Sequence, residues 1–172
     1  MMVRICVALS VALLLAGCAA DNYIPKEQPS FYRNLAQPGA QLDATAAASM
    51  ISGYRANNGL DAVSLDPELM RLAEEQAKSM AAKNELDHDV KKPFIARLKA
   101  SGYEAKTAAE NIGAGYHTLA EAFSGWRDSP PHKANMLLKS ATRMGIAAVY
   151  APTSKYKVFW ALIVAEPDER RG

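Results

Sequence analysis

Three polar residues lie in otherwise apolar or structured surroundings and are candidates for chemistry. His88 follows a predicted helix, Glu110 lies among small apolar residues, and His132 begins a helical turn after two prolines. Two imidazoles and one carboxylate can form a three-ligand zinc site with an open position, where bound water ionises near neutral pH. Each residue taken alone is more typical of a surface or capping position, and the alternative to a metal site is that the three form a hydrogen-bonded structural cluster.

Other polar residues give a weaker indication of hydrolysis. Asp128 and Glu121 are candidates for a general base only because they lie near His132 in the sequence. Ser129 precedes His132 by three residues but lacks the Gly-x-Ser-x-Gly turn that exposes a serine nucleophile. His117 precedes a predicted helix cap and is expected to be solvated. The sequence therefore names no convincing nucleophile or base.

Helical and strand patterns predict the elements that position these residues. The strongest helix begins at the N-cap Asp66 with Pro67 in its first turn, and its apolar residues then recur every three or four positions. Helices before and after a small antiparallel sheet indicate an α+β fold, an α-β-α layered sandwich. The predicted helices cover 43–57, 66–84, 94–98, 118–126 and 129–138, and the predicted strands cover 105–113, 144–150 and 156–164.

Composition limits the class of protein. The 172 residues are 49% hydrophobic, and 20 Lys and Arg against 18 Asp and Glu leave a net charge of +2. This near-neutral balance is unlike that of a strongly basic nucleic-acid binder, so no nucleic-acid partner is expected. The two cysteines, Cys6 and Cys18, both precede the predicted domain at 43–167. The domain is therefore expected to fold without disulfides.

The first residues resemble a bacterial lipoprotein signal. Arg4 precedes an apolar stretch too short to span a bilayer, and Leu15-Ala16-Gly17-Cys18 resembles the lipobox, in which the cysteine sulfur carries diacylglycerol. We therefore expect a membrane partner through lipidated Cys18, and Ala19 after it implies the outer membrane of a Gram-negative envelope, facing the periplasm. The remaining predicted segments are a signal peptide at 1–17, a lipidated N-terminus and flexible tether at 18–42, and a charged tail at 168–172.

A set of motifs in a fixed order resembles the CAP superfamily, which includes cysteine-rich secretory proteins, venom allergens and plant pathogenesis-related proteins. The resemblance covers about 43–166 and implies the α-β-α sandwich of that family. It also implies a cleft in which His88, Glu110 and His132 match the family's two histidines and glutamate, and where some members bind zinc or another divalent ion. The motifs are Ala109-Glu110-Asn111-Ile112, Gly125-Trp126, Ser129-Pro130-Pro131-His132-Lys133-Ala134-Asn135-Met136-Leu137 and Met144-Gly145-Ile146.

The sequence departs from the animal and plant members of this family at three points. Ser129 stands where those members place another cleft glutamate, Lys133 and Ala134 replace an aromatic segment after His132, and the disulfides are absent. The resemblance favours a non-enzymatic envelope module that binds a metal, a lipid or a glycan-peptide ligand. The alternative is a metal-assisted hydrolase that acts on an envelope peptide or ester.

The lipobox generates a first prediction. In the Cys18→Ser variant the thioether to diacylglycerol cannot form, so the protein should accumulate as unlipidated precursor or as soluble protein. Fractionation followed by mass spectrometry of the mature N-terminus checks this. A wild-type protein that is entirely soluble and carries no acyl mass would remove the lipoprotein prediction.

Overall fold

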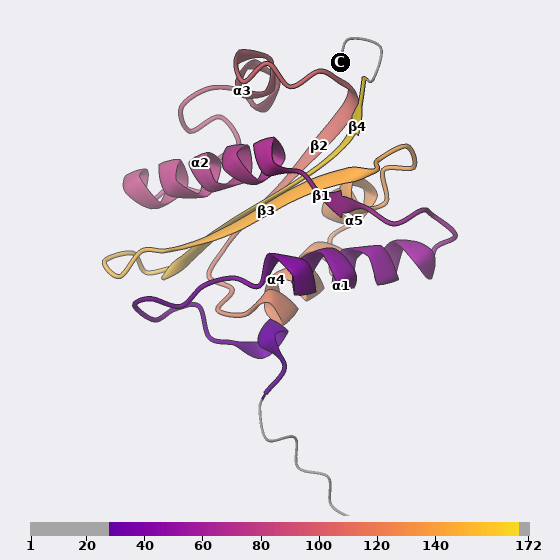
Figure 1. The fold of residues 1–172 in the computed structure, drawn as a ribbon. Helices are drawn as coiled ribbons and strands as arrows, with labels where there is room; N and C mark the ends of the chain where they lie inside the picture. Colours follow the sequence, from indigo (N-terminus) through magenta and orange to yellow (C-terminus); the bar gives the residue numbers. More distant parts are fainter. Residues whose placement is uncertain (1–27, 169–172) are drawn as a thin grey trace, which may run out of the picture.

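The computed structural model of the protein describes residues 28–168. The predicted signal peptide, Cys18 and residues 169–172 lie outside the described residues. A four-stranded sheet separates two layers of helices, with α2 and α3 on one face and α1, α4 and α5 on the other (Figure 1). Within residues 28–168 no helix is long and apolar enough to span a membrane. The predicted α-β-α sandwich is confirmed.

Each predicted helix and strand is present, with ends within a few residues of those expected. One strand was missed: β1 has only two residues, too few to show a period, and it pairs with β3 in parallel. The sheet, with strand order β1-β3-β4-β2, is therefore mixed, although its other pairings are antiparallel as predicted. The elements are η1 (Ser30–Tyr32), α1 (Ala44–Ala56), β1 (Ser64–Leu65), α2 (Pro67–Lys83), α3 (Phe94–Ala100), β2 (Ala105–Ala114), α4 (Leu119–Asp128), α5 (Pro130–Met136), β3 (Arg143–Tyr150) and β4 (Val158–Pro167).

Helix α2 lies directly against the sheet because of its apolar face and one glycine. The Asp66 side chain accepts from the amides of Glu68 and Leu69 and so caps the helix as predicted. A Cβ built on Gly145 of β3 would lie 2.1 Å from the backbone carbon of Leu69, so only glycine permits this approach. The buried face of α2 includes Leu69, Leu72, Ala73, Gln76, Ala77 and Met80.

Two tryptophans pack in the core on the face of the sheet opposite α2. Trp126 of α4 and Trp160 of β4 are both buried, and their rings meet edge to face with centroids 6.3 Å apart. The indole of Trp126 also donates to the Ile112 carbonyl of β2 at 3.0 Å. This hydrogen bond fixes α4 on the strand that carries Glu110.

A buried arginine joins α1 to the chain after α5. Arg55 is fully buried, and its guanidinium donates to the Asp61 carbonyl at 2.8 Å and to three more carbonyls at 2.9 Å each. Those three belong to Met136, Leu138 and Ala141, at the end of α5 and in the connection to β3. Arg55 therefore holds the C-terminal end of the helix that carries His132.

Part of the segment predicted as a flexible tether, 18–42, is folded. Leu35 is 4% exposed, and its amide donates to the His117 carbonyl at 2.7 Å. The Ser30 hydroxyl donates to Asp43, the N-cap of α1, at 2.7 Å. Pro29 instead precedes the 3₁₀ turn η1, and the apolar side chains of Phe31 and Leu35 pack on the domain.

Trp126 tests this packing. Trp126→Ala should lower the free energy of unfolding by about 3–5 kcal/mol, because the substitution leaves a cavity and removes the bond to Ile112. Urea denaturation followed by circular dichroism measures the change. Ile95→Ala, at a position that is 52% exposed, serves as the control and should have little effect. An unchanged midpoint in Trp126→Ala would contradict the assigned burial.

Candidate functional site

Glu110 lies at the centre of the candidate site, with its side chain only 1% exposed. Its Oε1 accepts from Nδ1 of His88 at 2.8 Å, and its Oε2 accepts from Nη2 of Arg97 at 2.7 Å. The carboxylate thus pairs with the imidazole of His88, from the loop after α2, and with the guanidinium of Arg97, from α3. A buried carboxylate requires such partners, because burial without them strongly disfavours its charge.

The backbone around His88 is held by α2 and α3. Gln76, on the buried face of α2, donates from Nε2 to the carbonyls of Asp87 and His88 at 2.8 and 3.1 Å. Arg97 of α3 donates from Nε to the Lys92 carbonyl at 3.2 Å. The imidazole itself is 47% exposed. His88 is therefore positioned by buried groups but remains accessible.

His132 is attached to the same strand through two asparagines. Asn111, which follows Glu110 in β2, donates from Nδ2 to the His132 carbonyl at 2.9 Å. Asn135, one turn further along α5, donates to the Glu110 carbonyl at 3.1 Å and to Oδ1 of Asn111 at 2.9 Å. Asn111 is 1% exposed, so these bonds are shielded from water.

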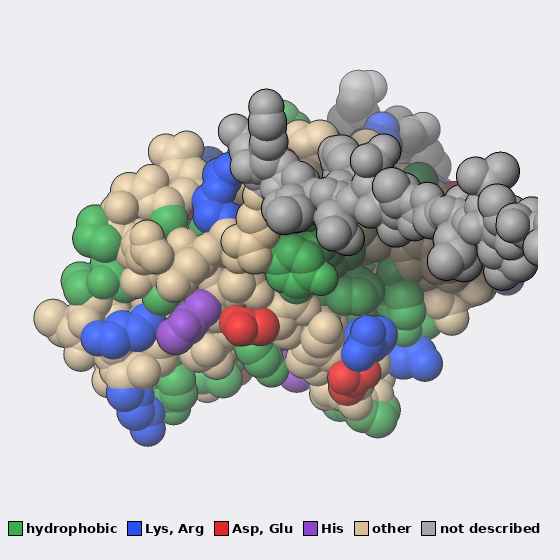
Figure 2. Space-filling view, turned by 90° about the horizontal axis from the view of Figure 1, so that it is seen from below, with side chains coloured by type: hydrophobic (Ala, Val, Ile, Leu, Met, Phe, Trp, Pro, Cys, Tyr) green, Lys and Arg blue, Asp and Glu red, His purple; other side chains and the backbone are tan. Residues whose placement is uncertain are grey.

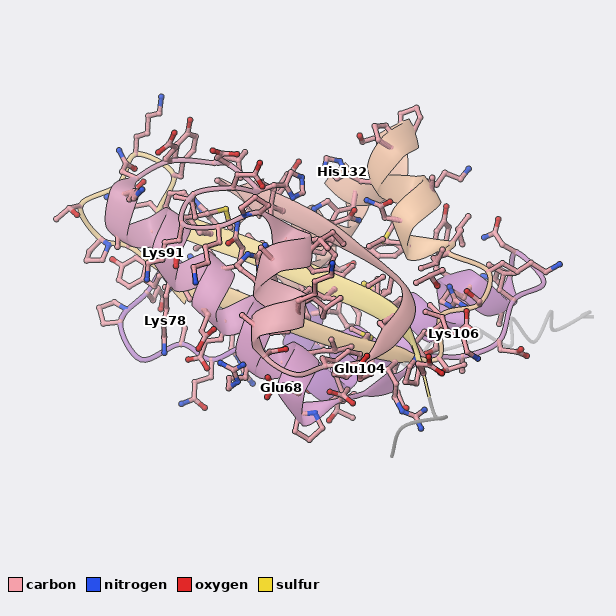
Figure 3. All side chains as sticks on the ribbon, turned by 90° about the horizontal axis from the view of Figure 1, so that it is seen from above. Glu68, Lys78, Lys91, Glu104, Lys106 and His132 are labelled. Atoms are coloured by element: carbon pink, nitrogen blue, oxygen red, sulfur yellow. The ribbon has the colours of Figure 1, made fainter. Side chains whose placement is uncertain are left out.

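The structure brings two of the three predicted site residues into contact. His88 and Glu110 are hydrogen-bonded, whereas Nδ1 of His132 lies 2.9 Å from the hydroxyl of Ser129, in the position of the missing family glutamate. His132 lies within α5 (Figure 3). The side chain of His88 and the backbone carbonyl of His132 are thus bonded to consecutive residues of β2, Glu110 and Asn111. We call His88, Glu110 and His132, together with Arg97, Asn111 and Asn135, the histidine cluster.

The other residues considered for catalysis have different partners. Glu121 completes a capping box with Thr118 at the start of α4 and also accepts from the amide of His117. Asp128 forms an ion pair with Arg127 at 2.8 Å on the surface. The hydroxyl of Ser129 contacts the imidazole of His132 within one helical turn and makes no side-chain capping bond to the backbone of α5. None of these contacts places a base or a nucleophile against His88.

The two histidines have pKa values shifted in opposite directions. The hydrogen bond to Glu110 raises the pKa of His88 above its usual 6.5, against the opposing effect of partial burial. Burial lowers the pKa of His132, and the charge of His88 lowers it further. His88 therefore holds its proton more firmly than an ordinary histidine, and His132 holds its proton less firmly.

The arrangement does not fit the expected three-ligand metal site. Residues 28–168 contain no group of three or more His, Cys, Asp or Glu side chains placed to hold a metal ion. Both oxygens of Glu110 are engaged, and the guanidinium of Arg97 beside it would repel a divalent cation. Glu110 is better suited to positioning His88 than to coordinating zinc.

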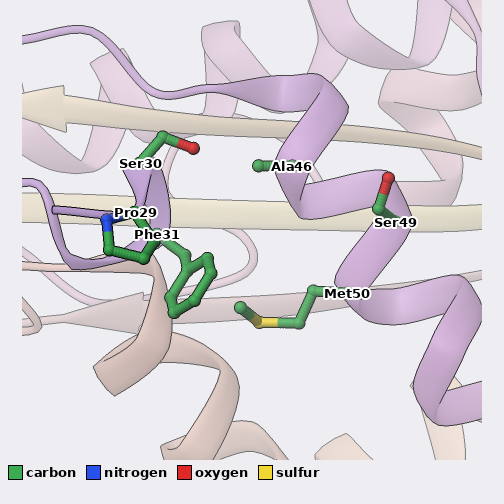
Figure 4. Close-up of a pocket in the computed structure, with 6 residues that line it drawn as sticks. All are labelled: Pro29, Ser30, Phe31, Ala46, Ser49 and Met50. Atoms are coloured by element: carbon green, nitrogen blue, oxygen red, sulfur yellow. The ribbon is translucent and has the colours of Figure 1, made fainter. Parts of the chain in front are cut away.

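Two cavities are lined by described residues outside the histidine cluster, except that Arg97 contributes to the lining of one of them. One, of about 440 Å³, lies between η1 and α1 (Figure 4), and its lining is Pro29, Ser30, Phe31, Ala46, Ser49 and Met50. The other, of about 810 Å³, lies along α2 and α3 and reaches Arg97. Neither is lined by His88 or His132.

Sequence reasoning missed four side chains that build or support the cluster. Gln76 lies within the apolar face of α2, and a polar residue at a predicted core position was the signal available for it. Asn111 and Asn135 belong to the motifs quoted above, yet nothing local indicated that they bond to each other. Arg97 has no distinguishing pattern, because exposed arginines at helix ends are common.

Comparison with known proteins agrees with this fold. The model of the cysteine-rich secretory protein (CAP) family matches residues 48–164, so the chain belongs to that family. YkwD of Bacillus subtilis, an uncharacterized protein, is 31% identical over 119 residues, which are 61% of this chain and 46% of that protein. The chain thus spans about half the length of this curated relative.

Solved structures share the fold at low sequence identity. An outer surface protein from Borrelia burgdorferi has a TM-score of 0.66 at 16% identity, over 76% of this chain and 99% of that chain. An extracellular protein containing an SCP domain from Bacillus anthracis has a TM-score of 0.62 at 22% identity, over 71% of this chain and 39% of that chain. At these identities the likeness shows the fold alone.

The opposite pKa shifts generate a prediction. In a titration followed by NMR of the imidazole protons, His88 should titrate above 6.5 and His132 below it. Glu110→Gln should lower the pKa of His88, because the neutral amide removes the main cause of the shift. The pKa of His132 should remain low, since its main cause is burial.

The same pKa shifts make the free energy of unfolding depend on pH, in opposite directions for the two histidines. Because the folded-state pKa of His88 is raised, its contact with Glu110 stabilises fully below about 6.5 and weakens as pH rises through the raised value. His132 contributes oppositely, and its contribution is lost as pH falls through its lowered pKa. As pH rises, the free energy of unfolding should therefore fall less in His88→Gln than in the wild-type protein. Denaturation at several pH values measures this difference, and identical pH profiles in the two proteins would contradict the assigned contact.

Proposed function

We propose that this protein is a non-enzymatic binding module of the bacterial cell envelope, and that it recognises its ligand through the histidine cluster. The observation that supports this most is the engagement of Glu110. With one oxygen bonded to His88 and the other to Arg97, the carboxylate is committed to positioning. The accessible polar groups of the cluster are then the imidazoles, which suit recognition of a ligand.

The same contacts argue against the alternative of hydrolysis. A metal-assisted hydrolase requires ligands that hold an ion and a base that activates water. Glu110 already has two close partners, Glu121 caps α4, and Asp128 pairs with Arg127. A base must reach the proton that it removes, and none of these carboxylates is presented to His88 or His132 as a free acceptor.

An envelope location is proposed from the sequence and from similar proteins. The lipobox ending in Cys18 predicts anchoring, and two or more acyl chains give stable attachment to a membrane. The similar structures include an outer surface protein and an extracellular protein. We infer that the domain faces the extracytoplasmic side, and propose the outer membrane as its site of attachment.

The chemistry of the cluster favours a polar ligand. His88 is half exposed and has a raised pKa, and His132 is half buried and has a lowered pKa. One imidazole can thus donate to a carboxylate while the other donates to, or accepts from, a carbonyl or hydroxyl group. A glycan-peptide from the envelope carries all three groups, whereas an acyl chain carries none, so we propose the glycan-peptide as the ligand class.

The test combines binding with turnover. Soluble glycan-peptide fragments of a bacterial cell wall should bind the purified protein in calorimetric titration, and His88→Ala and His132→Ala should each weaken that binding about tenfold or more. His117→Ala is the matched control, because His117 lies outside the cluster. A panel of peptide and ester substrates should not be turned over, and zinc should not bind tightly, since Glu110 is engaged.

The outcomes separate the two functions. Turnover that Glu110→Gln or His88→Ala abolishes would contradict the proposal and support a hydrolase. Tight zinc binding that both histidine variants lose would restore the three-ligand site and overturn the positioning role of Glu110. Absence of fragment binding by the folded wild-type protein, or equal binding by all variants, would reject the glycan-peptide ligand.

A further inference from the structure

The larger cavity is a groove between α2 and α3 with a strongly cationic lining. It measures about 810 Å³, within the usual range for small-molecule sites. Leu72, Ala82 and Ala100 contribute an apolar part of its wall, and Glu75 is its one acidic residue. Its cationic residues are Arg71, Lys78, Lys91, Lys92 and Arg97.

Some of these cations are already paired, and others are not. Arg71 pairs with Glu68 and Glu75 along α2, and Lys78 pairs with Glu74 at 2.6 Å. The ammonium groups of Lys91 and Lys92 form no hydrogen bond or ion pair with any of residues 28–168. Because Glu75 is neutralised by Arg71, the groove retains an excess of positive charge.

Arg97 supplies a second, independent indication of a ligand. Its side chain is 10% exposed and lines the groove, and two of its three nitrogens have acceptors, in Lys92 and Glu110. The third, Nη1, is buried and has no hydrogen-bond partner within the described chain. Buried donors in folded proteins nearly always have an acceptor, so the guanidinium of Arg97 is an incompletely satisfied cation in the lining of the groove.

The groove and the histidine cluster are distinct places that share one side chain. In Figure 3, Lys78 and Lys91 lie near each other over α2, well apart from His132. The opposite face of the molecule, seen in Figure 2, carries scattered charges of both signs. Only the α2 and α3 side thus combines a cavity, an excess of positive charge and an unsatisfied arginine among the described residues.

We propose that the groove between α2 and α3 binds a phosphate-bearing ligand, through the ammonium groups of Lys91 and Lys92 and with the cationic side chain of Arg97 in the lining. A planar guanidinium and flexible ammonium groups are the side chains that bind phosphate oxygens best. The apolar wall and the volume leave room for an organic group beyond the phosphate. The source is a soluble phosphorylated molecule or the anionic headgroup of a phospholipid. The groove shares the side chain of Arg97 with the histidine cluster, but this proposal does not rest on the ligand proposed for that cluster.

The test uses phosphate itself and then vesicles. Inorganic phosphate added to the purified protein should shift the backbone amide NMR signals of residues 78–101, whereas chloride at equal ionic strength should not. Lys91→Gln combined with Lys92→Gln should weaken this binding about tenfold, because two contacting charges are removed. Both positions are exposed, so the variant is expected to fold. Lys99→Gln, on α3 but outside the groove lining, and Lys139→Gln are the matched controls.

A second measurement distinguishes the sources. Vesicles of phosphatidylcholine with phosphatidylglycerol are compared with vesicles of phosphatidylcholine alone, so that any lipid anchor contributes equally to both. Stronger binding to the anionic vesicles that the Lys91 and Lys92 variant loses supports a headgroup, and phosphate binding without this difference supports a soluble ligand. No phosphate-specific shift, or equal shifts in the double variant and the controls, would overturn the site without affecting the histidine cluster.

Discussion

The rest of the site depends on one buried carboxylate. Glu110 lies on β2 with its side chain 1% exposed, where an unpaired charge would be strongly unfavourable. Its two oxygens must each find a donor, and they find His88 and Arg97. These donors come from the loop after α2 and from helix α3, so both segments must lie against β2. One ionised side chain thus fixes the placement of two separate segments.

The residue after Glu110 in β2 connects the strand to the helices on the other face of the sheet. Asn111 points to α5, where it bonds to the His132 carbonyl and to Asn135. The alternation of side chains along a strand explains how consecutive residues can serve opposite faces. Trp126, bonded to the next carbonyl at Ile112, then fixes α4 on the same strand. Three consecutive residues of β2 therefore position three helical segments.

Arg97 couples the two surfaces proposed to bind ligands. One of its nitrogens holds Glu110, and its side chain lines the groove between α2 and α3. An anion in that groove would partly neutralise a guanidinium on which the position of His88 depends through Glu110. This arrangement gives a physical route from one surface to the other, through two hydrogen bonds and no change of fold.

The sequence alone determined the elements and the candidate residues, because helix caps, apolar periods and turn residues act over a few neighbouring positions. The face of α2, the capping box at Thr118, the α-β-α class and the choice of His88, Glu110 and His132 follow from such local patterns and from the family motifs. Only the tertiary structure decided what these residues do. Glu110 is committed by Arg97, a residue with no local signal, and the folded segment around Leu35 is held by packing on distant residues. Long-range partners cannot be read from spacing, and in the folded chain they engage both oxygens of the carboxylate that the sequence offered as a metal ligand.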